Sequence, residues 1–421
     1  MCKLNNRFTQ KKGKLYMNEK KYTLKDKIMA MGPGLLIVGS FIGPGTVTSS
    51  TRAGANYGYD LLWCVVFSVV AVIIMQGMSA RLGIVTQKGI PENLLKELKD
   101  RPFLKNFMVF LVAAAILLGG VAYMSGDLTG TALGLSALTG INTRWIAIGW
   151  GICILILNAR DNAIKWLEKL LGVCVSVMAL VFLITMFVVK PDWGAVFGGV
   201  IPSVPAGAIM TCVSLIGTTV VPYNLFIHAT SSSQTWKDPA EIPLANFSTR
   251  ATMIIGGIIT GAIMVTSATV MHGMEVNSAI DMAEQLKPLL GNAAVPFLAV
   301  GLMAAGISSS IITPLGVSYV FAGLFGWELK KTDKRYFWTN TGIVIFGIIG
   351  ASTGFNPLAL IMAAQAVNGV FLPVSIFVLL FLASKASIMG EHKNGPLQVV
   401  LGIAVFAISL IIGVSSVLSL F

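Results

Sequence analysis

The sequence predicts an all-α, polytopic membrane protein built from two inverted repeats of five spans plus one extra span. Of its 421 residues, 55% are hydrophobic and only 11% are charged, and the mean hydropathy is +0.81. A soluble protein of this length could not cover its surface with so few charges. Eleven apolar segments are long enough to cross a bilayer, and two of them are interrupted at positions that correspond in the two halves.

The predicted spans need about 20 apolar residues each to cross roughly 30 Å of hydrocarbon. They lie at 28–56, 60–84, 104–138, 143–158, 162–189, 207–232, 248–271, 293–326, 335–352, 357–384 and 396–420. The fourth and ninth are short, and the third and eighth are long enough to require tilting. We therefore expect a cytoplasmic tail (1–27), a first repeat (28–189), a second repeat (190–384) and an additional span 11 (385–421).

The interruptions fall in spans 1 and 6. Residues 41–58 read F-I-G-P-G-T-V-T-S-S-T-R-A-G-A-N-Y-G, and residues 217–224 read G-T-T-V-V-P-Y-N. Proline removes a backbone donor and glycine adds flexibility, so both stretches should break a helix. Broken helices at membrane depth are tolerated where they line a protein-walled cavity, and such pairs mark substrate sites in secondary transporters. Because the breaks lie five spans apart, the two units must insert with opposite topology.

The basic residues of the loops predict the orientation. With the N-terminus inside, the cytoplasmic loops carry most Lys and Arg residues, among them Lys88, Lys96, Lys99, Arg101 and Lys105. The loops then assigned to the outside carry only Arg144, Lys190 and Lys287. We expect a multi-pass protein of the plasma (inner) membrane with a cytoplasmic N-terminus and an extracytoplasmic C-terminus.

Composition also argues against several function classes. The net charge of +12 comes from short loops, so it does not predict nucleic-acid binding. Five scattered cysteines imply neither a disulfide framework nor a metal cluster. The Lys-rich start lacks the apolar core of a signal peptide. We find no P-loop and no paired carboxylates, and we expect no enzymatic activity and no cofactor.

Several motifs resemble the Nramp (natural resistance-associated macrophage protein) family of metal transporters. G-P-G-T-V-T-S-S-T-R-A-G (43–54) is similar to its span-1 signature, and I-G-T-T-V-V-P-Y-N-L-F-I-H (216–228) to its span-6 signature. R-L-G-I-V-T-Q-K-G (81–89), A-A-G-I-S-S-S-I-I-T (304–313), Gln365 and Leu372-Pro373 match spans 2, 8 and 10. The resemblance covers nearly the full chain and implies a LeuT-type fold that works by alternating access.

The departures from the family pattern fall on the metal ligands. The family's ligand Asp and Asn are Gly43 and Thr46 here, and its Met and His beside the span-6 proline are Val221 and Tyr223. Thr218 replaces the Ala whose carbonyl contributes to the site, and the Glu of the span-3 motif is Gly130. A site without carboxylate or thioether lacks the groups that select Mn²⁺ or Fe²⁺.

Three ionisable residues lie well inside the predicted spans: Arg52, Asp127 and His228. Such residues are costly in a membrane and serve as functional hypotheses. Gly45, Ser49 and Arg52 would share one helix face, so Arg52 could overhang the cavity, or it could snorkel to the outer headgroups. Asp127 and His228 are candidates for proton coupling, with a pairing or interhelical hydrogen-bonding role as the alternative.

The predicted substrate site combines both breaks with span 10. Its members are Gly43, Gly45, Thr46, Ser49, Arg52, Thr218, Val221, Tyr223, Asn224 and Gln365. An arginine, two half-helix N-termini and a ring of hydroxyls suit a carboxylate. We therefore predict a secondary transporter for a small organic anion, a di- or tricarboxylate such as citrate, alone or with a bound divalent cation.

Two alternatives remain open. The first is a transporter of a hydrated hard cation such as Mg²⁺, or of Mn²⁺, held by Thr46, Tyr223, Asn224 and backbone carbonyls. The second is a non-transporting sensor on a transporter fold. A proton or divalent cation is the expected co-substrate, the bilayer and a small molecule are the expected partners, and we expect a monomer or weak oligomer.

Overall fold

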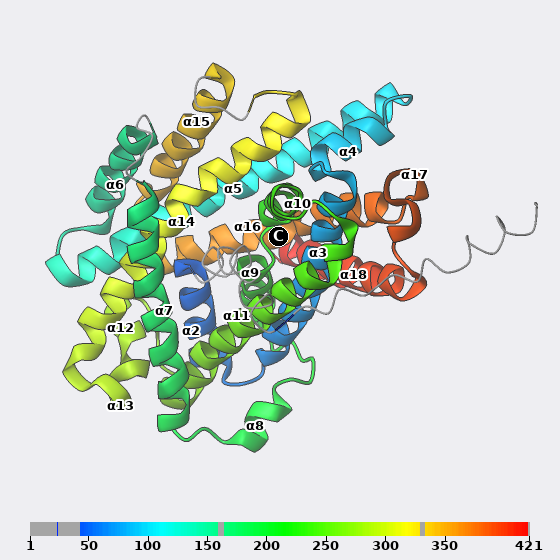
Figure 1. The fold of residues 1–421 in the computed structure, drawn as a ribbon. Helices are drawn as coiled ribbons and strands as arrows, with labels where there is room; N and C mark the ends of the chain where they lie inside the picture. The colour runs from blue at the N-terminus through cyan, green and yellow to red at the C-terminus, as the bar shows by residue number, and fades with distance from the viewer. Residues whose placement is uncertain (1–22, 24–42, 159–163, 329–332, 420–421) are drawn as a thin grey trace, which may run out of the picture.

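The computed structural model describes residues 23, 43–158, 164–328 and 333–419, and within these ranges every regular element is a helix (Figure 1). Apart from Thr23, the predicted tail (1–27) lies outside the described residues. So do the first part of span 1 (28–42) and the start of span 5 (162–163). The all-α prediction is confirmed for the described part of the chain.

Nine long helices correspond to predicted spans among the described residues. They are α3 (Leu62–Thr86), α5 (Pro102–Thr139), α6 (Thr143–Asn158), α7 (Ile164–Val188), α11 (Ile242–Val270), α14 (Ala294–Phe325), α15 (Lys334–Ala351), α16 (Pro357–Ala383) and α18 (Pro396–Leu418). By length and composition, eight helical stretches of the described chain could cross a membrane, and α6 is a shorter apolar helix. The polytopic prediction therefore holds, whereas the number of eleven spans is not confirmed.

Both predicted interruptions coincide with the ends of helices. α2 (Pro44–Tyr57) begins at the Gly-Pro-Gly stretch. Span 6 is divided into α9 (Ile209–Thr219) and α10 (Pro222–Thr235), with two non-helical residues between them. In both places a proline occupies the first helical position, where its missing N–H costs no hydrogen bond.

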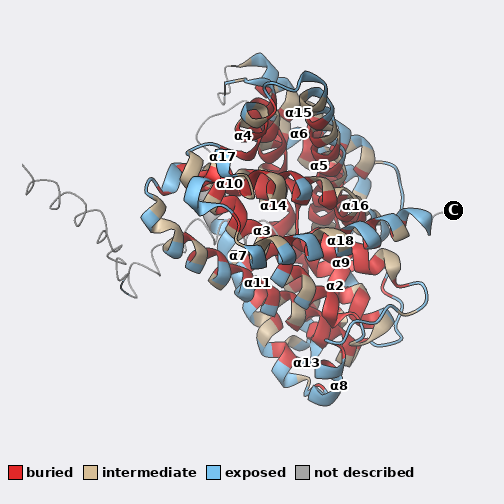
Figure 2. Ribbon diagram, turned by 90° about the vertical axis from the view of Figure 1, so that its right-hand side faces the viewer, coloured by how far each residue is buried: buried red, intermediate tan, exposed pale blue. Residues whose placement is uncertain are grey.

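The connecting segments contain short helices that the sequence analysis assigned to loops. They are α4 (Ile90–Glu97), α8 (Trp193–Gly198), η1 (Pro239–Glu241), α12 (Ala279–Ala283), η2 (Glu284–Leu286), α13 (Lys287–Leu290), η3 (Gly291–Ala293), α17 (Ala386–Met389) and η4 (Gly390–His392). They are too short for a hydropathy window to detect. α4 and α17 lie at one end of the bundle, and α8 and α13 lie at the other (Figures 1 and 2).

The centre of the bundle is formed by the interrupted helices. The apolar part of the stretch Ile209–Thr235 is almost entirely buried, whereas most of the apolar part of α18 is not. Figure 2 shows the buried residues concentrated in the interior of the bundle. α9 packs on α16, α3 and α2, while α5 runs along α14 and α16. The two breaks are thus enclosed by protein, as broken helices at membrane depth require.

Candidate functional site

The first break places an uncapped helix N-terminus inside the protein. Gly43 has extended backbone angles (φ −107°, ψ −175°) and precedes Pro44, the first residue of α2. Because Gly43 has no side chain, it cannot cap the helix, and the first-turn N–H groups point into the interior. Among the described residues, an added Cβ at Gly43 would approach only Ser309, at 3.9 Å from its Oγ.

The second break brings a helix C-terminus and a helix N-terminus together. α9 ends at Thr219, where the N–H of Val220 bonds to the carbonyl of Ile216. Val221 then precedes Pro222, the first residue of α10, in an extended conformation. The last carbonyls of α9 carry the negative end of its dipole, and the start of α10 carries a positive end. The sequence analysis predicts two positive helix ends at the site, one after each break, and the structure adds the negative end of α9.

The two breaks are joined by a hydrogen bond between threonines. Thr46 Oγ1 of α2 lies 3.0 Å from Thr218 Oγ1 of α9, and both residues are fully buried. This contact links segments 172 residues apart in the chain. The resemblance implies a ligand Asn at position 46 and a ligand backbone carbonyl at position 218. In this chain both positions carry threonine hydroxyls, and these two hydroxyls meet.

Gln365 of α16 packs against Gly45 and Gly217, the residues that precede Thr46 and Thr218. A Cβ added to Gly45 would overlap the Gln365 side chain, and one added to Gly217 would overlap the Gln365 backbone carbonyl. Gln365 is fully buried, yet neither its Oε1 nor its Nε2 has a hydrogen-bond partner among the described residues. A buried, unsatisfied amide is costly and marks a place where a polar ligand or water would be stabilised.

The next turns of α2 carry further hydroxyls and then Arg52. The hydroxyls of Thr48, Ser49 and Ser50 are buried and have no partner in the described chain. Arg52 is partly exposed and forms no hydrogen bond or ion pair with a described residue. Seven residues separate it from Gly45, about 10 Å along a helix. The structure confirms the helix on which Gly45, Ser49 and Arg52 were predicted to share a face.

A polar chain connects Tyr223 with Asp127. The Tyr223 hydroxyl lies 3.2 Å from Thr313 Oγ1, and Thr313 donates to Asp127 Oδ2 at 2.8 Å. Since Thr313 has one proton to donate, Tyr223 is the donor in the first bond. Asp127 is buried and forms no ion pair with a described residue, so its contacts there are with neutral groups.

The remaining predicted residues lie around the second break. Val221 and Asn224 are buried beside the start of α10. His228 is buried one turn further along, and its Nδ1 has no hydrogen-bond partner among the described residues. No hydrogen bond joins His228 to Asp127, so the two proton-coupling candidates occupy different surroundings.

Sequence reasoning missed two members of this network. Thr313 connects Tyr223 with Asp127, and Ser309 supplies a second hydroxyl to the Asp127 carboxyl. Both belong to the segment A-A-G-I-S-S-S-I-I-T (304–313), one of the motifs that resemble the family. The spacing of these two residues, one helical turn apart on α14, was the available signal.

The donor set of the site is made of neutral oxygens. In the described part of the chain, no three His, Cys, Asp or Glu side chains come together as potential metal ligands. The groups at the two breaks are hydroxyls, an amide and backbone carbonyls, which are ligands for hard cations or hydrogen-bond partners for polar solutes.

Comparison with known proteins gives consistent results. A family model for natural resistance-associated macrophage protein-like proteins (Nramp) matches residues 34–419. The divalent metal cation transporters MntH of Deinococcus radiodurans and Acidiphilium cryptum are 27% and 29% identical to this chain. The alignments cover 90% and 93% of it, and 88% and 92% of the relatives.

Solved structures agree on the fold. The Eremococcus coleocola manganese transporter superimposes with a TM-score of 0.76 at 21% identity, covering 93% of this chain and 87% of that one. MhsT in complex with L-phenylalanine gives a TM-score of 0.58 at 17% identity, covering 95% and 99%. The chain therefore has the LeuT-type fold, as predicted.

The packing of Gly45 against Gln365 can be tested by paired substitutions. Gly45→Ala should lower the stability of the purified protein by about 1–3 kcal/mol, because the added methyl overlaps the Gln365 amide. Gln365→Ala removes the overlap, so the double variant should be more stable than the sum of the single effects, by about 0.5–3 kcal/mol. Thermal unfolding in detergent measures both.

Gly261→Ala is the matched control, because a Cβ there meets no described residue within 4 Å. It should not lower stability. Strictly additive effects at positions 45 and 365 would contradict the packing described here.

Proposed function

Because the chain belongs to the Nramp family, with a match over residues 34–419, we propose that it is a secondary active transporter that moves a hard divalent cation by alternating access. The observation that carries the proposal is the meeting of the two helix breaks at Thr46 and Thr218, 3.0 Å apart, in neutral oxygen surroundings. The names of the MntH relatives, divalent metal cation transporters, support a divalent cation as cargo. They favour this alternative over the organic anion of the sequence interpretation.

The ligand types favour a hard cation over a transition metal. Thr46, Tyr223 and Asn224 would offer oxygens, and the last carbonyls of α9 add the negative end of a helix dipole. Gly43 and Val221 provide neither a carboxylate nor a sulfur. Mg²⁺ binds oxygen ligands and usually retains several waters, so a site with few strong ligands suits it.

The family and the helical stretches support a location in the plasma membrane. We further propose that the N-terminus is cytoplasmic, because α4 and the residues on either side of it include Lys88, Lys96 and Lys99. Figure 2 shows α4 and α17 at the same end of the bundle. The end with α8 and α13 would then face outwards. The C-terminal helix α18 would end on that outer side.

Uptake into proteoliposomes tests the cargo. Mg²⁺ uptake should be saturable without any organic acid present, and micromolar Mn²⁺ should be taken up poorly by the wild type. The double variant Gly43→Asp/Val221→Met should raise Mn²⁺ uptake about tenfold or more, the factor that corresponds to about 1.4 kcal/mol of added binding. The backbone tolerates both residues, since positions 43 and 221 are extended. Saturable uptake of micromolar Mn²⁺ by the wild type would contradict the inference that the ligand types favour a hard cation. If Mg²⁺ is not taken up, the proposed cargo is wrong.

Asp127 is the proposed proton-coupling residue. Asp127→Asn should abolish the stimulation of uptake by an inward proton gradient while substrate binding is retained, because an amide still accepts from Thr313 but cannot titrate. The control is Asp192→Asn, since Asp192 only caps the surface helix α8 and Asn caps equally well. Unchanged gradient dependence in the Asp127 variant would move the role to His228 or to the substrate.

A second candidate for the substrate is a small organic anion, and the position of Arg52 on α2 favours it. Its guanidinium has no acidic partner among the described residues, and it follows three buried residues of α2 whose hydroxyls are unpartnered there. An arginine can hold a carboxylate through two parallel N–H···O bonds. The di- or tricarboxylate of the sequence interpretation therefore stays a proposal beside the cation.

Calorimetry with citrate, alone and with Mg²⁺, distinguishes the two candidates. If the anion is the substrate, Arg52→Ala should weaken citrate binding about tenfold or more, and Arg52→Lys should restore only part of the affinity. Arg144→Ala is the control, because Arg144 is another arginine that lies over its neighbour Trp145. Citrate affinity within twofold of wild type in Arg52→Ala would exclude Arg52, and with it the main support for an anion.

A further inference from the structure

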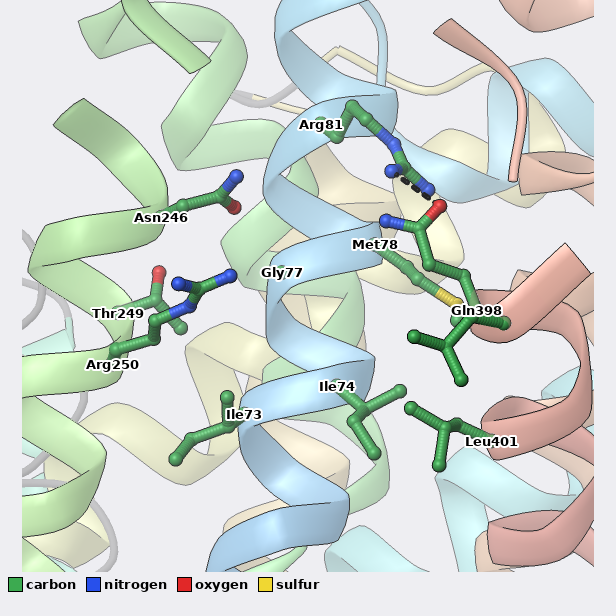
Figure 3. A pocket seen from close by; sticks show the side chains of 11 residues that line it. Ile73, Ile74, Gly77, Met78, Arg81, Asn246, Thr249, Arg250, Gln398 and Leu401 are labelled. Carbon is green, nitrogen blue, oxygen red and sulfur yellow. Dashed lines mark hydrogen bonds between the residues drawn. The ribbon is translucent and has the colours of Figure 1, made fainter. Parts of the chain in front are cut away.

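A groove lies on the outside of the bundle, away from the helix breaks. It has a volume of about 270 Å³ and is formed by α3, α11 and α18. Figure 3 shows α3 in the centre, with Asn246 and Arg250 of α11 on one side and Gln398 and Leu401 of α18 on the other. Gly77 leaves the middle of the groove open, because an added Cβ would approach only Asn246 in the described part of the chain, at 3.6 Å.

The groove contains two arginines and no acidic residue. Arg250 is exposed and forms no hydrogen bond or ion pair with a described residue. Arg81 donates to the neutral side chains of Gln398, at 2.9 Å, and Asn394. Its Nε is buried without a partner in the described chain. Neither charge is therefore balanced by a carboxylate in this part of the molecule.

The rest of the lining is apolar and faces the surroundings of the bundle. Ile73 and Ile74 of α3 are partly exposed, and Leu397 and Leu401 of α18 are 70% and 39% exposed. The three helices are all long and apolar enough to cross a membrane. Their shared outer face is therefore in contact with lipid when the protein spans a bilayer.

The depth of the groove follows from the ends of these helices. Arg250 lies eight residues after Ile242, the first residue of α11, or about 12 Å along the axis. Arg81 lies five residues before the end of α3, and Gln398 lies two residues after the start of α18. All three ends are on the side that carries Lys88 and Lys96 in the next segment. An arginine at this depth reaches the level of the headgroups of that leaflet.

We propose that this groove binds one anionic phospholipid of the leaflet on the α4 side, which the basic loops predict to be cytoplasmic. The phosphate diester accepts from the Arg250 guanidinium and the Asn246 amide, and Arg81 adds a second positive charge behind it. An acyl chain lies along Ile73, Ile74 and Leu401. Basic pockets between membrane helices on the cytoplasmic side are suited to such headgroups, because that leaflet is rich in anionic lipid.

The proposal is tested with the full-length protein, purified in detergent and delipidated. Phosphatidylglycerol and phosphatidylcholine of equal chain length are titrated in turn, and bound lipid is counted by native mass spectrometry. The wild type should bind one phosphatidylglycerol in preference to phosphatidylcholine. Arg250→Gln should weaken phosphatidylglycerol binding about fivefold, the effect of one arginine at a membrane surface, and leave phosphatidylcholine binding unchanged.

Two further variants separate charge from shape. Gly77→Leu fills the groove without changing any charge and should weaken binding of the anionic lipid as well. Arg144→Gln removes an arginine at the other end of the molecule and should behave as wild type. Equal binding of both lipids by the wild type, or an unchanged lipid preference in both Arg250→Gln and Gly77→Leu, would overturn the proposal. Thermal unfolding without lipid shows whether each variant is folded.

Discussion

The structure depends on enclosing two broken helices within a membrane. At the start of α2 and between α9 and α10, backbone N–H and C=O groups lack the intrahelical partners that every span needs in hydrocarbon. The neighbouring helices approach closely enough to exclude lipid because glycines stand at the contacts. A side chain at Gly130 would overlap Pro44, and one at Gly217 would overlap the backbone of α16. Close packing here is therefore a condition for having the site at all.

The same enclosure gives the site its chemistry. The groups at the two breaks are hydroxyls, amides and helix ends, and positions 43 and 221, where the resemblance implies a carboxylate and a thioether, carry Gly and Val. The Thr46 and Thr218 hydroxyls, 3.0 Å apart, hold the two breaks together, and each oxygen keeps a lone pair that could face the proposed cation.

The outer part of α2 is held differently from its start. Thr51 accepts from Gln285, at 2.8 Å, and its carbonyl accepts from Ser267, at 2.6 Å. Gly54 lies against the backbone of α11, where any larger residue would clash. The outer part of α2 is therefore held by α11 and by η2, while its first turn contacts α9 and α16.

The sequence by itself determined the helical, membrane-spanning architecture and the positions of both breaks. Hydropathy, proline and glycine act locally, so they can be read from one segment at a time. The pairing of Thr46 with Thr218 and the burial of Gln365 without a partner were decided by tertiary structure. Tertiary structure also decided that Thr313 connects Tyr223 to Asp127 and that the negative end of α9 lies at the site. These features join residues from different helices, and no local pattern encodes which faces of those helices meet.

The groove with Arg81 and Arg250 was also decided by tertiary structure. Each arginine lies near the end of its own span, and no pattern within one span shows that α3, α11 and α18 lie side by side.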